Sequence, residues 1–79
     1  MNKQVHVPDS RTLFASNVKR LRLQKGISQE KLAEMAGFHR TYMSQVERCV
    51  ANPSLDTVQK IASVLAVPVA TLLETPKRG

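Results

Sequence analysis

The sequence predicts an all-α fold, a compact domain of five helices. Three observations point to this class. Apolar residues recur at helical spacing along most of the chain, no segment alternates as a half-buried strand would, and Gly and Pro separate the periodic segments. The chain has 79 residues, of which 42% are hydrophobic but only 4% aromatic, so we expect one small core of aliphatic side chains.

The first helix is expected at residues 11–25, where apolar residues fall on one face at helical spacing. Residues 1–9 show no periodicity and are interpreted as a flexible N-terminal arm. Asp9 or Ser10 can cap the helix, because a short oxygen side chain accepts hydrogen bonds from the free N–H groups of a first turn. Gly26 is expected to end the helix, since glycine adopts positive φ without steric cost.

The second and third helices are expected to be short and joined by a tight turn. Ser28 is the predicted N-cap of the second helix, and Gly37 is expected to end it. The third helix follows at residues 40–48, with His39 at an N-cap position that this side chain fills poorly. Two short helices joined by such a turn, with Gly in it, are typical of a helix-turn-helix.

A loop at residues 51–54 separates the third helix from a fourth, expected at residues 55–65. Pro53 interrupts the helical pattern, and Ser54 is the predicted N-cap of the fourth helix. This helix has a continuous apolar face, which we expect to be buried. The residues of that face are Leu55, Val58, Ile61, Ala62 and Leu65.

The last helix is expected at residues 68–74, opened by Pro68, because proline is tolerated where a helix begins. These elements place the folded domain at residues 10–74. They leave residues 75–79 as a basic C-terminal tail.

Twelve Lys and Arg against six Asp and Glu give a formal net charge of +6. This excess suits a polyanionic partner, either nucleic acid or an acidic membrane surface. A soluble protein that happens to be basic is also compatible with the charge. No apolar run approaches the roughly 20 residues that span a bilayer, and the N-terminus lacks the apolar centre of a signal peptide. We therefore expect a cytoplasmic protein.

Catalytic and metal-binding chemistry is not indicated. Cys49 is the single cysteine, so it cannot form an intramolecular disulfide, and it shares no metal-ligand spacing with His6 or His39. We expect no enzymatic activity, no metal, no cofactor and no small-molecule ligand.

The third predicted helix carries a polar face suited to reading bases. Positions i, i+3 and i+4 are neighbours on a helix. The four residues of this face are Arg40, Thr41, Ser44 and Gln45. In the major groove, arginine can bind guanine and glutamine can bind adenine, each through two hydrogen bonds. Any one of the four could simply be solvated, but together, directly after a helix-helix turn, they favour base contacts.

Other polar residues around the turn suit phosphate contacts. Ser28 and Gln29 begin a helix, whose free N–H groups and dipole attract anions. Tyr42 could donate its hydroxyl to a phosphate or pack its ring over the edge of the domain, and the sequence leaves both open. The remaining candidates for phosphate contacts are His39, Arg48 and Asn52.

SQEKLAEMAGFHRTYMSQVER followed by NPSLDTVQKIASVLAV resembles the Cro/repressor-type helix-turn-helix (XRE) family over about residues 14–73. The resemblance implies a lambda-repressor-like DNA-binding domain, with Gln29 on the phosphate side and the four polar residues of the third helix facing bases. It also implies an ion pair between Arg22 and Glu47 that joins the first and third helices. Cys49 stands where the family usually has a helix-ending Gly, so a positive φ there would strain it.

RTYMSQVE is also similar to the recognition helix of restriction–modification controller proteins, which are small dimers. We therefore expect a sequence-specific DNA-binding transcriptional regulator of restriction–modification genes and of its own gene. One helix reads too few base pairs for useful discrimination, so we expect a homodimer on a near-palindromic operator. The predicted partners are double-stranded DNA, a second copy and RNA polymerase.

The last helix and its approach supply the expected dimer surface, although the same residues could equally belong to the core. These residues are Val67, Val69, Ala70 and Leu73. The alternative function is an antitoxin or another protein-interaction module built on the same domain. A peripheral membrane protein is disfavoured, because it would need a long basic amphipathic helix with Trp or Phe on its apolar face.

Overall fold

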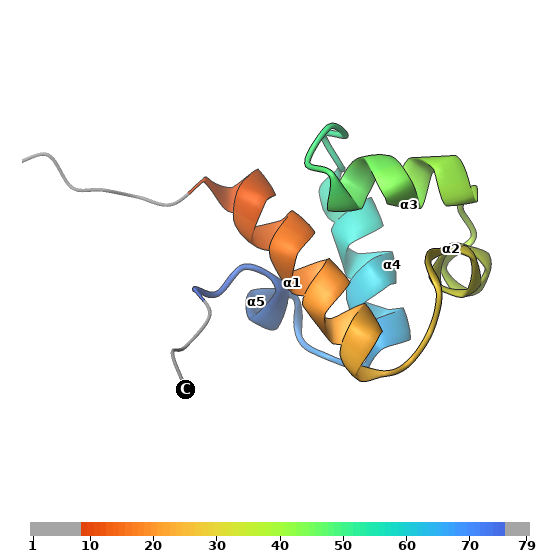
Figure 1. Ribbon diagram of the computed structural model, residues 1–79. Coiled ribbons are helices and arrows are strands. Elements are labelled where there is room, and N and C mark those ends of the chain that lie inside the picture. Colours follow the sequence, from red (N-terminus) through yellow and green to blue (C-terminus); the bar gives the residue numbers. More distant parts are fainter. Residues whose placement is uncertain (1–8, 76–79) are drawn as a thin grey trace, which may run out of the picture.

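The computed structural model describes residues 9–75, which form five helices and no strand (Figure 1). The helices are α1 (Ser10–Gln24), α2 (Gln29–Ala36), α3 (Arg40–Glu47), α4 (Leu55–Leu65) and α5 (Val69–Leu72). This architecture confirms the predicted all-α class. The expected arm and tail lie outside the described residues, except for Asp9 and Thr75.

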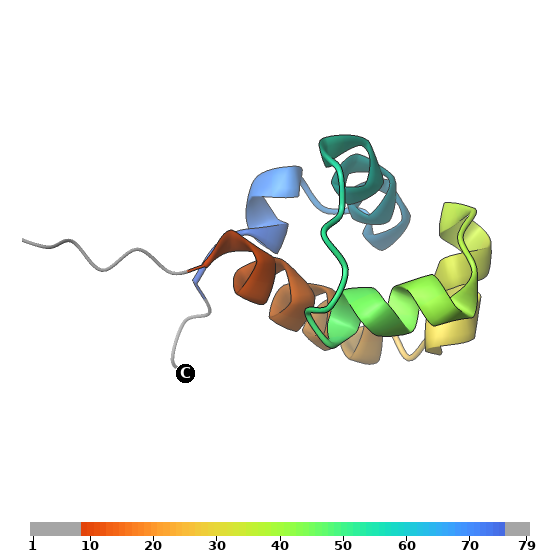
Figure 2. The ribbon, with the colours of Figure 1, turned by 90° about the horizontal axis from the view of Figure 1, so that it is seen from above.

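The helices surround one core. α1 packs against α3, α4 and α5, and α2 packs against α3 and α4 (Figures 1 and 2). As expected, the core is almost entirely aliphatic, and Phe14 is its one aromatic member that is fully buried. Its other large members include Val18, Leu32, Met43, Val46, Ile61, Leu65 and Leu72. Burial of these side chains supplies the main driving force for a domain of this size.

The starts of the helices follow the sequence signals. Asp9, Ser28 and Ser54 each accept a hydrogen bond from a backbone N–H of the following first turn, at 2.9–3.1 Å. Each such cap is worth about 1 kcal/mol. Asp9, and not Ser10, therefore caps α1. His39 stands at the N-cap of α3 and makes no side-chain capping bond, as expected.

Four helices end in the same backbone motif, with one residue in the left-handed region. In α1 and α2 that residue is Gly26 (φ 71°) or Gly37 (φ 81°). After α3 and α4 it is Cys49 (φ 60°) or Ala66 (φ 59°). The N–H of each pairs with the carbonyl three residues earlier, and the N–H of the next residue pairs with the carbonyl five residues back. The positive φ costs a non-glycine residue about 1–2 kcal/mol, so Cys49 carries the strain considered from the sequence.

The prediction that Leu55 is buried is wrong, since this side chain is 80% exposed. Leu55 is the first residue of α4, and the Cα–Cβ bonds of a helix tilt toward its N-terminus. The side chain therefore extends over the preceding loop instead of the core. The other four residues of the predicted apolar face of α4 are buried.

The short helix α5 is fastened to α1 by a buried amide that sequence reasoning missed. Asn17 is fully buried, and its Nδ2 donates to the carbonyls of Leu72 at 3.0 Å and Glu74 at 2.9 Å. Its Oδ1 accepts from Arg20 at 3.0 Å. A helix of four residues is not stable alone, so the bonds to its last carbonyl, that of Leu72, and to the carbonyl of Glu74 just beyond it hold α5 in place.

Candidate nucleic-acid interface

α3 has one face in the core and one face open to solvent. Met43 and Val46 are buried, which directs the opposite side of the helix outward. The four predicted base-reading residues lie on that side. Arg40 and Thr41 are exposed, and Ser44 and Gln45 are half-buried. The structure thus brings together the residues that the sequence grouped.

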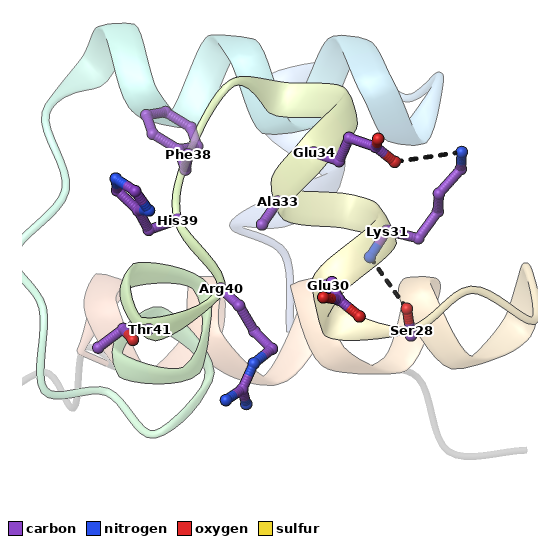
Figure 3. Close-up of a pocket in the computed structure, with 9 residues that line it drawn as sticks. All are labelled: Ser28, Glu30, Lys31, Ala33, Glu34, Phe38, His39, Arg40 and Thr41. Atoms are coloured by element: carbon purple, nitrogen blue, oxygen red, sulfur yellow. Dashed lines mark hydrogen bonds and ion pairs between the residues drawn. The ribbon is translucent and has the colours of Figure 1, made fainter.

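An open hollow of about 630 Å³ lies between the first turn of α2 and the start of α3 (Figure 3). Arg40 extends from the start of α3, and Ser28 caps α2 nearby. Glu30 and Glu34 lie on the α2 wall, and Glu34 pairs with Lys31 at 3.4 Å. These carboxylates repel phosphate, and Glu30 lies beside Ser28 in the same first turn of α2 (Figure 3). The hollow therefore carries both signs of charge.

The predicted Arg22–Glu47 ion pair is present and buried. Arg22 Nε lies 2.7 Å and Arg22 Nη2 3.0 Å from the two carboxylate oxygens, and the side chains are 10% and 2% exposed. Arg22 Nη1 also donates to the carbonyl of Ile27 at 2.9 Å. The Glu47 hydrogen bond raises the pKa of Arg22, against the lowering effect of burial. Protonation of Arg22 therefore stabilises the fold at neutral pH, and this contribution is lost only as pH rises through the raised pKa.

Gln29 completes a network that joins three helices. Its Nε2 donates to Glu47 Oε1 at 3.0 Å. The first residue of α2 is thereby tied to the last residue of α3, and through Glu47 to Arg22 of α1. The predicted contact of Gln29 with phosphate remains a prediction. Sequence reasoning missed the bond of Gln29 to Glu47. This bond fixes the start of α2 relative to α3.

The ring of Tyr42 packs within the domain. Its centroid lies 5.2 Å from that of Phe38 at an interplanar angle of 48°, and Lys60 Nζ lies 5.6 Å from the centroid of Phe38. The ring of Tyr42 therefore packs against the domain, which is one of the two roles that the sequence left open. A contact between its hydroxyl and a phosphate remains a prediction. Lys60 comes from α4, and no sequence signal placed it beside the turn.

The other predicted phosphate contacts lie at the ends of α3 and in the loop that follows. His39, Arg48 and Asn52 are all exposed. His39 precedes the helix and Arg48 follows it, so the exposed face of α3 has candidate phosphate contacts at both ends.

The predicted dimer residues are divided between the core and the surface. Val67, Val69 and Leu73 are half-buried and pack against the core, while Ala70 is exposed. Most of this set therefore has partners inside the domain. Its role in dimerisation remains a prediction.

Among residues 9–75, no group of three or more His, Cys, Asp or Glu is placed to hold a metal ion. Cys49 Sγ lies 3.8 Å from the Thr12 hydroxyl. Within the same residues, no helix combines the length and hydropathy needed to cross a bilayer.

Residues 18–72 match the profile of the family described as Helix-turn-helix (HTH_3). The chain therefore belongs to this family, which confirms the resemblance to Cro/repressor-type (XRE) proteins. It is 46% identical to the control protein C.BamHI of Bacillus amyloliquefaciens over 65 residues, which cover 81% of this chain and 80% of that protein.

Two solved structures connect this fold with regulation and DNA. The restriction–modification controller protein C.AhdI from Aeromonas hydrophila is similar with a TM-score of 0.75 and 37% identity, covering 78% of this chain and 94% of that one. The biofilm master regulator SinR, solved in complex with DNA, is similar with a TM-score of 0.73 and 40% identity, covering 77% of this chain and 98% of that one. The relatives are transcriptional regulators, and the narrower resemblance to controller proteins is confirmed.

Proposed function

We propose that this protein is a sequence-specific DNA-binding transcriptional regulator that inserts α3 into the major groove. The observation that carries the proposal is the division of α3 into a buried apolar side and an outward side with Arg40, Thr41, Ser44 and Gln45. An α-helix fits the major groove, and these side chains can form hydrogen bonds with base edges. The similarity to SinR, which was solved with DNA, supports the same mode.

The protein acts as a homodimer on a near-palindromic operator. One helix contacts only a few base pairs, and a genome offers many competing sites for so short a sequence. Two-fold pairing doubles the sequence that is read. It places the half-sites about one helical turn apart, roughly 34 Å.

The similarity to C.BamHI and C.AhdI supports a role as a restriction–modification controller. The protein would bind in the cytoplasm at the promoter of restriction–modification genes and of its own gene, with RNA polymerase as a partner. It would act by occupying DNA and not by catalysis. The level of the protein and the arrangement of its operators would then set the output.

Selection of bound sequences from random DNA tests the proposal. We expect enrichment of a two-fold symmetric site, whose half-site spacing reports the geometry of the dimer. A pool without any enriched sequence would contradict sequence-specific regulation and favour a protein-interaction module, such as an antitoxin.

Arg40→Ala tests the role of α3 on the selected site. We expect a loss of about 1–3 kcal/mol in binding and relaxed preference at one base pair, because a bidentate contact to a base is removed. Lys19→Ala is the matched control, since Lys19 is an exposed cation of α1 that lines a separate hollow. If Arg40→Ala weakened binding to operator and random DNA equally, Arg40 would contact phosphate and not a base.

A further inference from the structure

The start of α3 lacks two features that stabilise the starts of α2 and α4. His39 occupies the N-cap position without a side-chain capping bond, and no acidic residue lies in the first turn. α2 and α4 have both a serine cap and an acidic residue in the first turn. Two of the residues proposed to read bases, Arg40 and Thr41, lie in the uncapped turn. Their positions therefore depend on contacts with other parts of the domain.

Phe38, directly before His39, connects the start of α3 with α2 and α4. Its side chain is half-buried against the core, and its ring centroid lies 5.2 Å from that of Tyr42 in α3. Lys60 Nζ of α4 lies over the same ring, 5.6 Å from the centroid, and Figure 3 shows Phe38 beside α4. The N–H of Phe38 donates to the carbonyl of Ala33 in α2 at 2.8 Å. Phe38 thus lies where the start of α3 meets two other helices.

Lys60 is available for the contact with this ring. It is exposed, and it takes part in no ion pair within residues 9–75. A cation is attracted to the face of an aromatic ring, and at an exposed site this attraction is comparable in free energy to a side-chain cap. The aromatic pair of Phe38 and Tyr42 contributes a similar amount. The contacts of Phe38 can therefore replace the cap that His39 does not supply.

We propose that Lys60 and Phe38 are positioning residues for DNA reading, which hold the first turn of α3 in place of a cap. The inference rests on the proposed function and deepens it, since it gives a residue of α4 a role in the accuracy of reading. Lys60 acts through the ring of Phe38 and does not itself contact DNA.

The first and second turns of α3 should depend on this contact to different degrees. Arg40 and Thr41 lie in the first turn, so loosening of that turn moves both side chains. Ser44 and Gln45 lie in the next turn, where the buried Val46 holds α3 against the core. Loss of the contact should therefore weaken preference at base pairs read from the first turn and leave the others unchanged.

Amide hydrogen exchange of the free protein tests the positioning role without DNA. The N–H groups of Tyr42 and Met43 both donate to the carbonyl of His39, at 3.0 and 3.2 Å, and close the first turn. Lys60→Gln should speed exchange at these two amides about threefold, because local opening becomes easier. The variant should fold normally, since Lys60 is exposed and Lys and Gln have similar helix propensities. Lys19→Gln, which removes an exposed cation of α1, is the matched control and should leave both rates unchanged.

Two further backgrounds show whether the effect passes through the ring and the missing cap. In Phe38→Leu, which keeps an apolar side chain but removes the ring, Lys60→Gln should have no further effect on exchange. In His39→Ser, which supplies a capping hydroxyl, Lys60→Gln should speed exchange by less than about 1.5-fold. Each comparison is made within one background, so the effect of the background itself cancels. An undiminished effect in both backgrounds would overturn the inference.

Binding titrations connect the contact to DNA reading. Lys60→Gln should weaken binding to the selected operator about threefold and leave binding to random DNA of the same length unchanged, because phosphate contacts carry no sequence information. The lost preference should fall at the base pair that Arg40→Ala also affects. An equal loss on both DNAs, with a weaker dependence of affinity on salt, would show that Lys60 contacts phosphate and would overturn the inference.

The outcomes separate this inference from the proposed function. Unchanged exchange at Tyr42 and Met43 in Lys60→Gln would overturn the inference alone, whatever operator is selected. A selection that enriches no sequence would overturn the proposed function, and faster exchange in the same variant would still support the role of Lys60 at the start of α3.

Discussion

Two ion pairs involve residues of α2 or α3, and they are expected to differ greatly in their contribution to stability. Arg22 and Glu47 are 2.7 Å apart with side chains 10% and 2% exposed. Lys31 and Glu34 are 3.4 Å apart with side chains 56% and 71% exposed. The first pair joins α1 to α3, whereas the second joins neighbouring turns of α2. Both pairs bring opposite charges into contact. The difference in their contribution to the free energy of unfolding therefore comes from burial and from the number of hydrogen bonds.

We expect the largest loss of stability when the buried pair is broken. Glu47→Ala should lower the free energy of unfolding by about 3–5 kcal/mol, because it leaves the guanidinium of Arg22 buried without its counter-charge. Urea denaturation followed by circular dichroism would measure the loss.

A second variant shows whether the loss comes from an orphaned charge. The double change Arg22→Met and Glu47→Leu should recover much of the stability, since a buried pair can often be replaced by apolar residues of similar volume. If the double variant were less stable than Glu47→Ala, the network with Gln29 and Ile27 would account for the difference.

Cys49, just after the end of α3, has a strained backbone with φ 60°. Relief of this strain should change the free energy of unfolding by a smaller amount and in the opposite direction. Cys49→Gly should raise the free energy of unfolding by about 0.5–1 kcal/mol. The change removes a left-handed cost of about 1–2 kcal/mol and adds an entropic cost of about 0.5–1 kcal/mol. Thermal melting would measure the gain. A loss of stability would show that the contact of Cys49 Sγ with Thr12 outweighs the strain.

We expect the smallest change in stability when the exposed pair is broken. Lys31→Ala should change the free energy of unfolding by less than about 0.5 kcal/mol, because an exposed i,i+3 pair gains little in water. Denaturation at low and high salt would measure this. A loss approaching that of Glu47→Ala would contradict the view that burial separates the two pairs.

Local chemistry explains why much of the fold could be predicted. Ser28, Ser54, Gly26 and Gly37 act within one turn of their own position, and the structure places each where it was expected. The bounds of α4 agree for the same reason, since Ser54 caps the helix at one end. The predicted grouping of the polar face of α3 required only the spacing of a helix.

The errors and omissions concern contacts between distant segments. Leu55 fits the apolar pattern of α4 but lies beyond the edge of the core, and spacing alone does not give that edge. The bonds of Asn17 to α5 and of Gln29 to Glu47 join residues that are far apart in sequence.

By itself, the sequence determined the order of the five helices, the caps Ser28 and Ser54 and the polar face of α3, because hydrogen bonds within one turn and apolar periodicity act over a few residues. The last helix is shorter than the expected residues 68–74, since α5 covers only Val69–Leu72. The family relationship of the chain rests on the same local motifs. Only the tertiary structure decided which polar side chains are used internally and which apolar ones remain outside. Gln29 supports Glu47, Asn17 holds α5, and Leu55 stands exposed beside a hollow. Those outcomes depend on how separate helices pack, and burial changes both the strength of a charge pair and the partner that each side chain finds.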